Sequence, residues 1–255
     1  MHIVVTNDDG IVTPGLLALA TAMRKLGDVS ILAPDRNWSA SGHVRTIDRP
    51  LRVREVVLSD GSTAWACDGA PSDCVALALC GFFKDPVDLV VSGINPFANI
   101  GDDVTYSGTV TAAMEAVIGG LPAVAVSVDS PDNHLGIVDY QPAAEQALKI
   151  TGTMLKKGLP KGLLLNVNVP YIPGDKIKGI RITRQGKREY HDRLDKRIDP
   201  RGKPYYWAIG DLPTAHEEPG NDVEALLNGY VSVTPVQLDL TAYRFLPELN
   251  SWNWE

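Results

Sequence analysis

The stretch HIVVTNDDG, residues 2–10, determines how the rest of the chain is interpreted. Its first half is a short β-rich run, and its second half consists of residues that favour turns. Thr13 and Pro14 then suit the start of a helix whose apolar residues recur at helical spacing, and Gly27 suits its end. A second apolar run, Val29 to Ala33, completes a β-α-β unit.

The same alternation continues along the chain, and the remaining strands are also continuous apolar runs. This pattern predicts a Rossmann-like, mainly parallel sheet with helices on both faces, because strands buried on both faces carry no polar alternation. Tyr230 to Val236 is predicted to be a last strand. The other predicted helices are Ser72–Phe83, Gly108–Ile118 and Pro142–Lys157, and the other predicted strands are Asp88–Ser92, Ala123–Val128 and Leu163–Val169.

Composition excludes several classes of protein. The 255 residues include 24 Lys and Arg against 31 Asp and Glu, a formal charge of −7, which argues against a general nucleic-acid binder. No apolar run approaches the roughly 18 residues of a membrane-spanning helix, so no membrane partner is expected. Because the N-terminal residues lack the pattern of a secretory signal, we expect a cytoplasmic protein.

Polar residues follow three of the predicted strands, where a parallel sheet places its ligands. These are the loops at residues 6–10, 34–43 and 93–103. Two adjacent carboxylates, Asp8 and Asp9, oppose each other's ionisation unless a cation lies between them. They therefore indicate a divalent metal, although a plain turn before a helix is the alternative. Oxygen donors favour Mg²⁺, Mn²⁺ or Ca²⁺ over Zn²⁺.

A second polar signal is the sequence Tyr106-Ser-Gly-Thr at the start of a predicted helix. A helix N-terminus has unpaired N–H groups and a partial positive charge, so it can hold a phosphate. Ser107 and Thr109 add hydroxyl donors, and Gly108 allows close approach. An ordinary N-cap is the alternative. Near the second loop, His43 is either a local hydrogen-bonding residue or a catalytic one.

Several familiar signatures are missing. The chain has neither a phosphate-binding loop of the G-x-x-x-x-G-K-[ST] type nor a G-x-G-x-x-G turn after the first strand. A G-x-S-x-G nucleophile motif is also absent. If Asp9 were the second acid of an Asp-x-Asp pair, the nucleophile position would be Asn7, which argues against an aspartyl-phosphate mechanism.

The sequence resembles the SurE survival-protein family of metal-dependent 5′-nucleotidases. Its polar loops and several further short motifs follow one another in the order found in that family, over roughly residues 1–241. The stretches that carry the resemblance are VTNDDG (5–10), APDRN (33–37) with Ser39, GAPSDCV (69–75), VSGIN (91–95), residues 99–103, YSGTV (106–110), AME (113–115), LNVNVP (165–170), PYYW (204–207) and GYVSVTP (229–235).

The resemblance implies a Rossmann-like catalytic core over residues 1–175 and a C-terminal extension over 176–255. The extension would contain a swapped hairpin arm, about 178–210, that builds homodimers or homotetramers, and a final strand that returns to the core. Residues 178–203 contain ten Lys and Arg but four Asp and Glu, a net charge of +6. From the residues alone, this basic stretch could be a solvated hairpin, an oligomerisation arm or an anion-binding surface, and solvated or interface structure is favoured.

The resemblance also implies hydrolysis of nucleoside 5′-monophosphates with one divalent metal ion per subunit, Mg²⁺ or Mn²⁺. Asp8, Asp9 and Asn95 would be catalytic, and which aspartate acts as the base stays open. The metal ligands would be Asp8, Asp9, Ser39 and Asn95, and the phosphate contacts would be Asn99, Ser107, Gly108 and Thr109.

One loop departs from the family pattern Ser-Gly-Ile-Asn-x-Gly-Pro-Asn. Here Phe97 replaces the glycine and a proline comes earlier, at Pro96. Phe97 could reshape the loop or stack on a base.

Three other functions stay open from the sequence. Hydrolysis of short-chain polyphosphate or of general phosphomonoesters keeps the chemistry but changes the substrate. A nucleotide or phosphate sensor without turnover is the second, and an oxidoreductase or methyltransferase on a Rossmann-like scaffold is the third.

Overall fold

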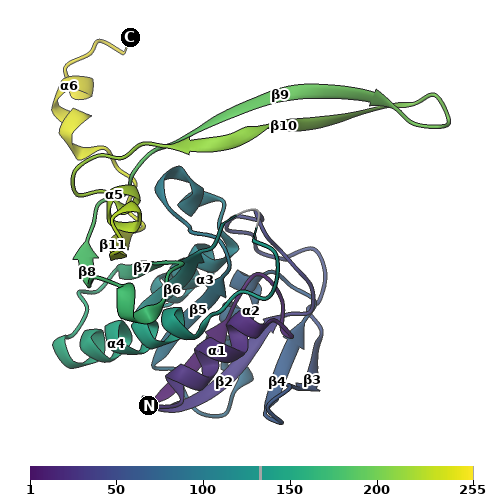
Figure 1. The fold of residues 1–255 in the computed structure, drawn as a ribbon, viewed down its shortest axis with the longest axis vertical. Helices are drawn as coiled ribbons and strands as arrows, with labels where there is room; N and C mark the ends of the chain where they lie inside the picture. The colour runs from purple at the N-terminus through teal and green to yellow at the C-terminus, as the bar shows by residue number, and fades with distance from the viewer. Residues whose placement is uncertain (132–133, 255) are drawn as a thin grey trace.

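A computed structural model describes residues 1–131 and 134–254 of the chain. In these residues a sheet of nine strands has the order β3-β4-β2-β1-β5-β6-β7-β11-β8 (Figure 1). Neighbouring strands from β4 to β7 in this order run parallel, whereas β3 and β11 run antiparallel to β4 and β7. The strands are β1 (His2–Thr6), β2 (Asp28–Pro34), β3 (Val53–Val57), β4 (Thr63–Cys67), β5 (Leu89–Asn95), β6 (Ala123–Asp129), β7 (Leu163–Pro170), β8 (Ile180–Ile182) and β11 (Val231–Gln237).

Helices cover both faces of this sheet. α1 (Pro14–Met23) and α4 (Gln141–Lys157) lie on one face, and α2 (Pro71–Leu77) and α3 (Gly108–Ile118) lie on the other (Figure 1). Ile3 and Val5 of β1 pack in the core under α1 and α4, whereas Val4 packs in the core with α2 and α3. The predicted Rossmann-like fold is therefore confirmed.

Shorter helical segments complete the described chain. They are the π-helical turn η1 (Ala78–Phe82), the 3₁₀ turns η2 (Gly101–Thr105), η3 (Gly174–Lys176) and η4 (Tyr243–Phe245), and the helices α5 (Asp222–Leu227) and α6 (Leu246–Asn250). None of the helices in the described residues has the length and apolar character needed to cross a membrane.

The sequence pattern did not predict the edge strand β3 or its neighbour β4. In β3 the residues Arg54, Glu55 and Val57 are exposed, so the strand lacks the continuous apolar run of the buried strands. The pattern also ended β5 too early. Gly93 and Asn95 were expected in a loop, but they belong to β5, which is buried throughout.

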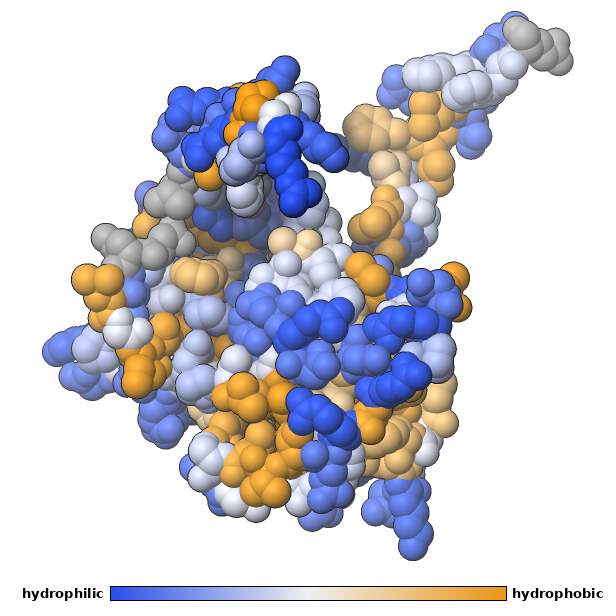
Figure 2. Space-filling view, turned by 90° about the vertical axis from the view of Figure 1, so that its right-hand side faces the viewer, coloured by the Kyte–Doolittle hydropathy of each residue, from blue (hydrophilic) through white to orange (hydrophobic). Residues whose placement is uncertain are grey.

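The last third of the chain contains a long two-stranded hairpin that projects from the body (Figure 1). Its strands are β9 (Arg188–Ile198) and β10 (Pro204–Ala215). The predicted arm at about 178–210 overlaps this hairpin, while residues 180–182 pair with β11 in the main sheet. Figure 2 shows the hairpin and the C-terminal segment as two lobes that stand apart from the body, each with hydrophobic residues on its surface. Exposed apolar side chains on the hairpin include Tyr190, Leu194, Ile198, Tyr205, Tyr206, Trp207 and Ile209.

Gly93 lies at an irregularity in the pairing of β5 with β6. The pairing register of these strands shifts between Ser92 and Asn95, which marks a bulge. Gly93 has a φ of +132°, and a Cβ atom at this position would clash with the carbonyl oxygen of Val126. Bulges of this kind re-aim the side chains that follow them, and here the next side chains include that of Asn95.

We predict that Gly93→Ala lowers the free energy of unfolding by at least about 3 kcal/mol, because it combines positive-φ strain with a backbone clash. Gly136→Ala is the matched control, since Gly136 has a φ of +127° but no atom of the described residues lies within 4 Å of the place that a Cβ atom would take. Its expected loss is about 1–2 kcal/mol from strain alone. Urea unfolding measures both, and equal losses would contradict the packing explanation.

Candidate active site

The site lies at the point where the chain connections reverse direction across the sheet. β1 leads through α1 to β2 on one side, and its other neighbour β5 leads through α3 to β6 on the opposite side. Asp8 and Asp9 follow the carboxyl end of β1, and Asn95 ends β5. Ligands of open α/β sheets bind at such switch points.

The turn that presents the two aspartates is organised by Asn7. Its buried side-chain Nδ2 donates to the Gly10 carbonyl at 3.1 Å and to the Thr13 hydroxyl at 2.7 Å, and its Oδ1 accepts from the Gly10 N–H at 3.2 Å. These hydrogen bonds close the turn on itself. The carboxylates that follow Asn7 are therefore presented from a fixed backbone.

Asp8 lies against the N-terminus of α3. Its buried carboxylate accepts a hydrogen bond from the Thr109 hydroxyl, and a Cβ atom on Gly108 would lie 2.6 Å from the Asp8 Cβ. Burial raises the pKa of Asp8, while hydrogen bonds from the Thr109 side chain and from the backbone of Gly108 and Thr109 oppose this rise. The absence of a side chain at Gly108 is thus what lets the carboxylate reach the helix.

Asp9 carries the second charge of the pair. Burial and the neighbouring negative charge of Asp8 raise the pKa of Asp9 to about 7. Without a cation, the site therefore disfavours two ionised carboxylates. A divalent cation removes this penalty, so the pair fits a metal site.

The two remaining predicted metal ligands offer neutral oxygens. Asn95 Nδ2 donates to the carbonyl of Phe97 at 2.6 Å, which leaves the Oδ1 atom of Asn95 as the atom for a cation. Ser39 is exposed on the loop after β2, and the backbone N–H of Trp38 donates to the Asp8 carbonyl at 2.7 Å. The structure thus brings the Ser39 loop against Asp8.

The donor set identifies the kind of metal that fits. In the part of the chain that the structure describes, no group of three or more His, Cys, Asp or Glu is arranged to hold a metal ion. The candidate ligands are two carboxylates with amide and hydroxyl oxygens. Oxygen donors of this kind suit hard cations such as Mg²⁺ and Mn²⁺.

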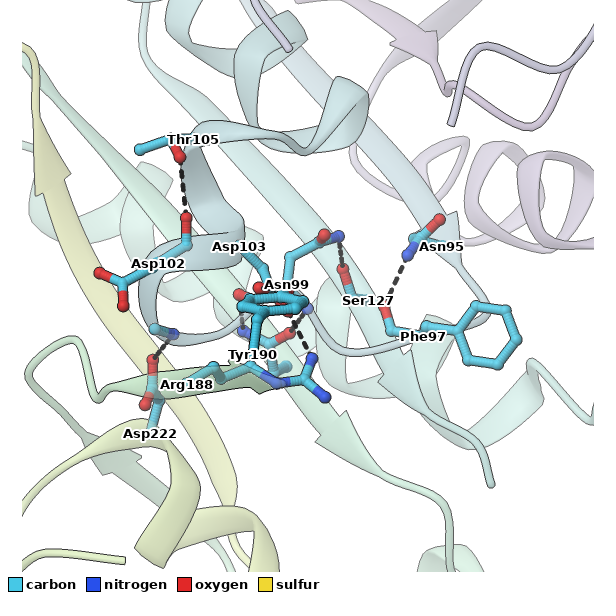
Figure 3. Close-up of polar contacts among 12 residues, drawn as sticks. Asn95, Phe97, Asn99, Asp102, Asp103, Thr105, Ser127, Arg188, Tyr190 and Asp222 are labelled. Atoms are coloured by element: carbon cyan, nitrogen blue, oxygen red, sulfur yellow. Dashed lines mark hydrogen bonds and ion pairs between the residues drawn. The ribbon is translucent and has the colours of Figure 1, made fainter. Parts of the chain in front are cut away.

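The predicted phosphate contacts occupy two neighbouring segments, and all of them are buried. Ser107 is the N-cap of α3, where its side chain accepts from the Val110 N–H at 3.1 Å, and Gly108 and Thr109 form the first turn. Asn99 lies on the loop after β5 and donates from Nδ2 to the Ser127 hydroxyl at 2.8 Å (Figure 3). The structure brings Gly108 and Thr109 next to Asp8.

Two asparagines that sequence reasoning left without a role fix the backbone of Asn99. Asn168 Oδ1 accepts from the Asn99 N–H at 2.8 Å, and its Nδ2 donates to the Asn99 carbonyl at 3.1 Å. Asn166 Nδ2 donates to the same carbonyl at 2.8 Å. Both are fully buried in β7. Two asparagines in an otherwise apolar strand are the feature of the sequence that could have indicated this role, because buried polar groups need hydrogen-bond partners.

The same loop is tied to the base of the hairpin. The buried carboxylate of Asp222 accepts from the backbone N–H of Gly101 at 3.0 Å and of Gly186 at 2.9 Å. Arg188 and Tyr190 of β9 both bind the carboxylate of Asp103 in η2 (Figure 3). The loop that follows Asn95 and carries Asn99 is therefore held by β7 on one side and by the hairpin on the other.

His43 takes part in an ion-pair network at the edge of the site. Its Nε2 lies 2.9 Å from Oε2 of Glu115 on α3, and Arg45 binds the other carboxylate oxygen. The hydrogen bond from His43 and the positive charge of Arg45 hold the pKa of Glu115 below its usual range. This arrangement agrees with the interpretation of His43 as a local hydrogen-bonding residue.

The fold and this geometry define a doubly wound α/β protein with a carboxylate pair and a helix N-terminus at its switch point. The family model described as survival protein SurE matches residues 3–192. A protein of Chloroflexus aggregans named 5′-nucleotidase SurE is 50% identical over 255 residues, covering 100% of both chains. Another of the same name, from Herpetosiphon aurantiacus, is 48% identical and covers 100% of this chain and 99% of its own.

A solved structure agrees with these sequence matches. The crystal structure of the SurE protein from Aquifex aeolicus superposes with a TM-score of 0.82 at 42% identity, covering 98% of each chain. The chain belongs to the SurE family, as its motifs indicated.

We predict that Mn²⁺ or Mg²⁺ stabilises the metal-free protein. At a metal concentration of about 100 times Kd the melting temperature should rise by roughly 5–10 °C. Asp9→Asn should abolish the rise, because it removes one of the two charges that the cation neutralises. Asp102→Asn is the control, since Asp102 is an exposed carboxylate on η2. A full rise in the Asp9→Asn variant would remove Asp9 from the ligand set.

We also predict that Asn168→Leu destabilises the protein by about 2–3 kcal/mol and lowers kcat, because it leaves the buried Asn99 N–H without its partner. Asn166→Leu should have a smaller effect on both. The Asn99 carbonyl keeps its bond to Asn168, and Asn166 Oδ1 has no hydrogen-bond partner among the described residues. Chemical unfolding and steady-state kinetics of the two variants test this order.

Proposed function

We propose that this chain is a divalent-metal-dependent 5′-nucleotidase that hydrolyses nucleoside 5′-monophosphates to nucleoside and phosphate. The observation that carries the proposal is the position of Asp8 and Asp9 against the N-terminus of α3. The carboxylate pair suits a cation and the helix N-terminus suits an anion, and a metal-assisted phosphatase requires both. The relatives named 5′-nucleotidase SurE, 50% and 48% identical over the whole chain, support the same activity.

The metal would be held by Asp8, Asp9, Ser39 and Asn95, and their oxygen donors favour Mg²⁺ or Mn²⁺. A divalent ion in this position supplies positive charge that offsets the charge of the phosphate and polarises its oxygens. The hydrogen bond from the Thr109 hydroxyl orients the carboxylate of Asp8 within this ligand set.

The remaining residues would bind the phosphate and move one proton. Ser107, Gly108 and Thr109 at the N-terminus of α3 donate to the phosphate oxygens, and Asn99 contributes its side-chain amide. One carboxylate of the Asp8–Asp9 pair accepts the proton of the attacking water. The water oxygen then bonds to phosphorus while the bond between phosphorus and the 5′-oxygen breaks. The 5′-oxygen takes up the proton that the carboxylate accepted, and the nucleoside leaves.

We also propose that the enzyme is a homodimer or homotetramer built through the hairpin. The exposed Leu194, Ile198, Trp207 and Ile209 give the projecting hairpin an apolar surface that nothing in the described chain covers. Exposed apolar surface of this kind is typical of a protein–protein interface.

We predict that wild-type protein releases phosphate from AMP, GMP and CMP with Mn²⁺ or Mg²⁺ but not with a chelator. Asp9→Asn should lower kcat at least about 100-fold, because it removes a carboxylate that would hold the cation and could accept the proton of the attacking water. Asp102→Asn should keep wild-type kcat, and circular dichroism should show that both variants are folded.

Two results would contradict the proposal. Full activity of Asp9→Asn would refute the role of the carboxylate pair. Phosphate release from tripolyphosphate but from no nucleoside monophosphate would assign the site to polyphosphate instead, a substrate suited to the basic residues of the hairpin.

A further inference from the structure

We propose that the cavity beside Phe97 is the nucleobase subsite of this enzyme and that the Phe97 ring stacks on the base. The inference rests on the proposed nucleotidase function and deepens it, because it says which part of the substrate is recognised and by which residue.

The cavity is formed by five separate segments of the chain. It has a volume of about 280 Å³ and is lined by the loop after β5, the segment after β6, the end regions of the hairpin and α5. This volume is just below the range of about 300–1,000 Å³ for complete ligand sites, which suits one part of a nucleotide. Its lining includes Phe97, Ser130, Arg188, Ala215 and Leu227.

The backbone around Phe97 is fixed from two sides. Its carbonyl accepts from Asn95 Nδ2 at 2.6 Å, and the preceding carbonyl, of Pro96, accepts from the backbone N–H of Ser130 at 3.2 Å and from the Ser130 hydroxyl. The position of the ring at the cavity is therefore set by hydrogen bonds that do not involve the ring itself.

The ring is nevertheless left open to solvent. Phe97 is 47% exposed, whereas its loop neighbours Ala98 and Ile100 are 8% and 7% exposed and pack on Val223 and Leu226 of α5. Figure 3 shows the ring pointing away from Asn99 and Ser127. A well-anchored loop thus buries two apolar side chains and presents the third, which is the arrangement of a stacking surface.

The position of the cavity beside the loop between Asn95 and Asn99 favours a nucleobase as the group that binds there. Phe97 lies between Asn95 and Asn99 in sequence, the predicted metal ligand and the predicted phosphate contact. A phosphate bound there leaves the rest of its substrate beside this loop. The cavity combines an aromatic ring with the guanidinium of Arg188, which Asp103 holds in place. Bases stack on aromatic rings and on guanidinium planes, whereas a second phosphate gains nothing from a phenyl ring.

The test compares two substrates that differ only in the base. With the Mn²⁺-loaded enzyme, Phe97→Ala should raise KM for AMP about 5- to 10-fold and leave kcat within about 2-fold, as expected for loss of one stacked base. KM for ribose 5-phosphate, which has no base, should stay unchanged. Phe97→Trp should restore a low KM for AMP.

Phe82→Ala is the matched control, because Phe82 is a 38% exposed ring in η1, before the amino end of β5. It should change neither KM. Equal changes for AMP and ribose 5-phosphate in Phe97→Ala would show that Phe97 only shapes the loop and would overturn the proposal.

A binding measurement separates this inference from the proposed function. Calorimetry with adenosine should show binding to the wild-type protein that is about 5- to 10-fold weaker in Phe97→Ala. If the wild type hydrolyses neither substrate but adenosine binds in this way, the nucleotidase fails and the subsite stands. If adenosine binds both proteins equally, or neither, the subsite is wrong.

Discussion

The repulsion between two adjacent, largely buried carboxylates is the constraint on which the site depends. Asp8 and Asp9 emerge together from β1, and Asp8 is accommodated because α3 begins directly opposite with Gly108 and the Thr109 hydroxyl. The remaining cost of burying two negative charges side by side is seen in the raised pKa values of both aspartates. A cation completes the charge balance, so the same geometry that strains the metal-free protein prepares it for a metal and its phosphate ligand.

Those parts of the fold that bury apolar residues on both sides were predictable from the sequence. α3 has the predicted bounds of Gly108–Ile118 because Ser107 caps its start and a Gly-Gly pair follows its end. The predicted ligand loops after β1, β2 and β5 do meet at one edge of the sheet, as parallel topology requires. That Asn95 belongs to β5 itself was not predictable, because its burial depends on tertiary packing.

Features set by long-range contacts could not be predicted. The strand β3 exists because β4 offers it a partner, not because its own residues are apolar. Asn166 and Asn168 stood out in the sequence, but their target, the backbone of Asn99, is 67 and 69 residues away along the chain. The sequence therefore shows which strands contain polar residues, whereas the three-dimensional structure is needed to identify their hydrogen-bond partners.

The attachment of the hairpin to the loop after β5 means that the hairpin is not a detachable appendage. Asp103 receives both of its partners in β9, and Asp222 joins the backbone of Gly101 to that of Gly186. Deleting the hairpin would remove the Arg188 and Tyr190 side chains that bind the Asp103 carboxylate. The segment between Asn99 and α3 would then lose these contacts. The hairpin, through which we propose that the chain assembles, and the loop that carries Asn99 are therefore held by the same contacts, so a change in one also affects the other.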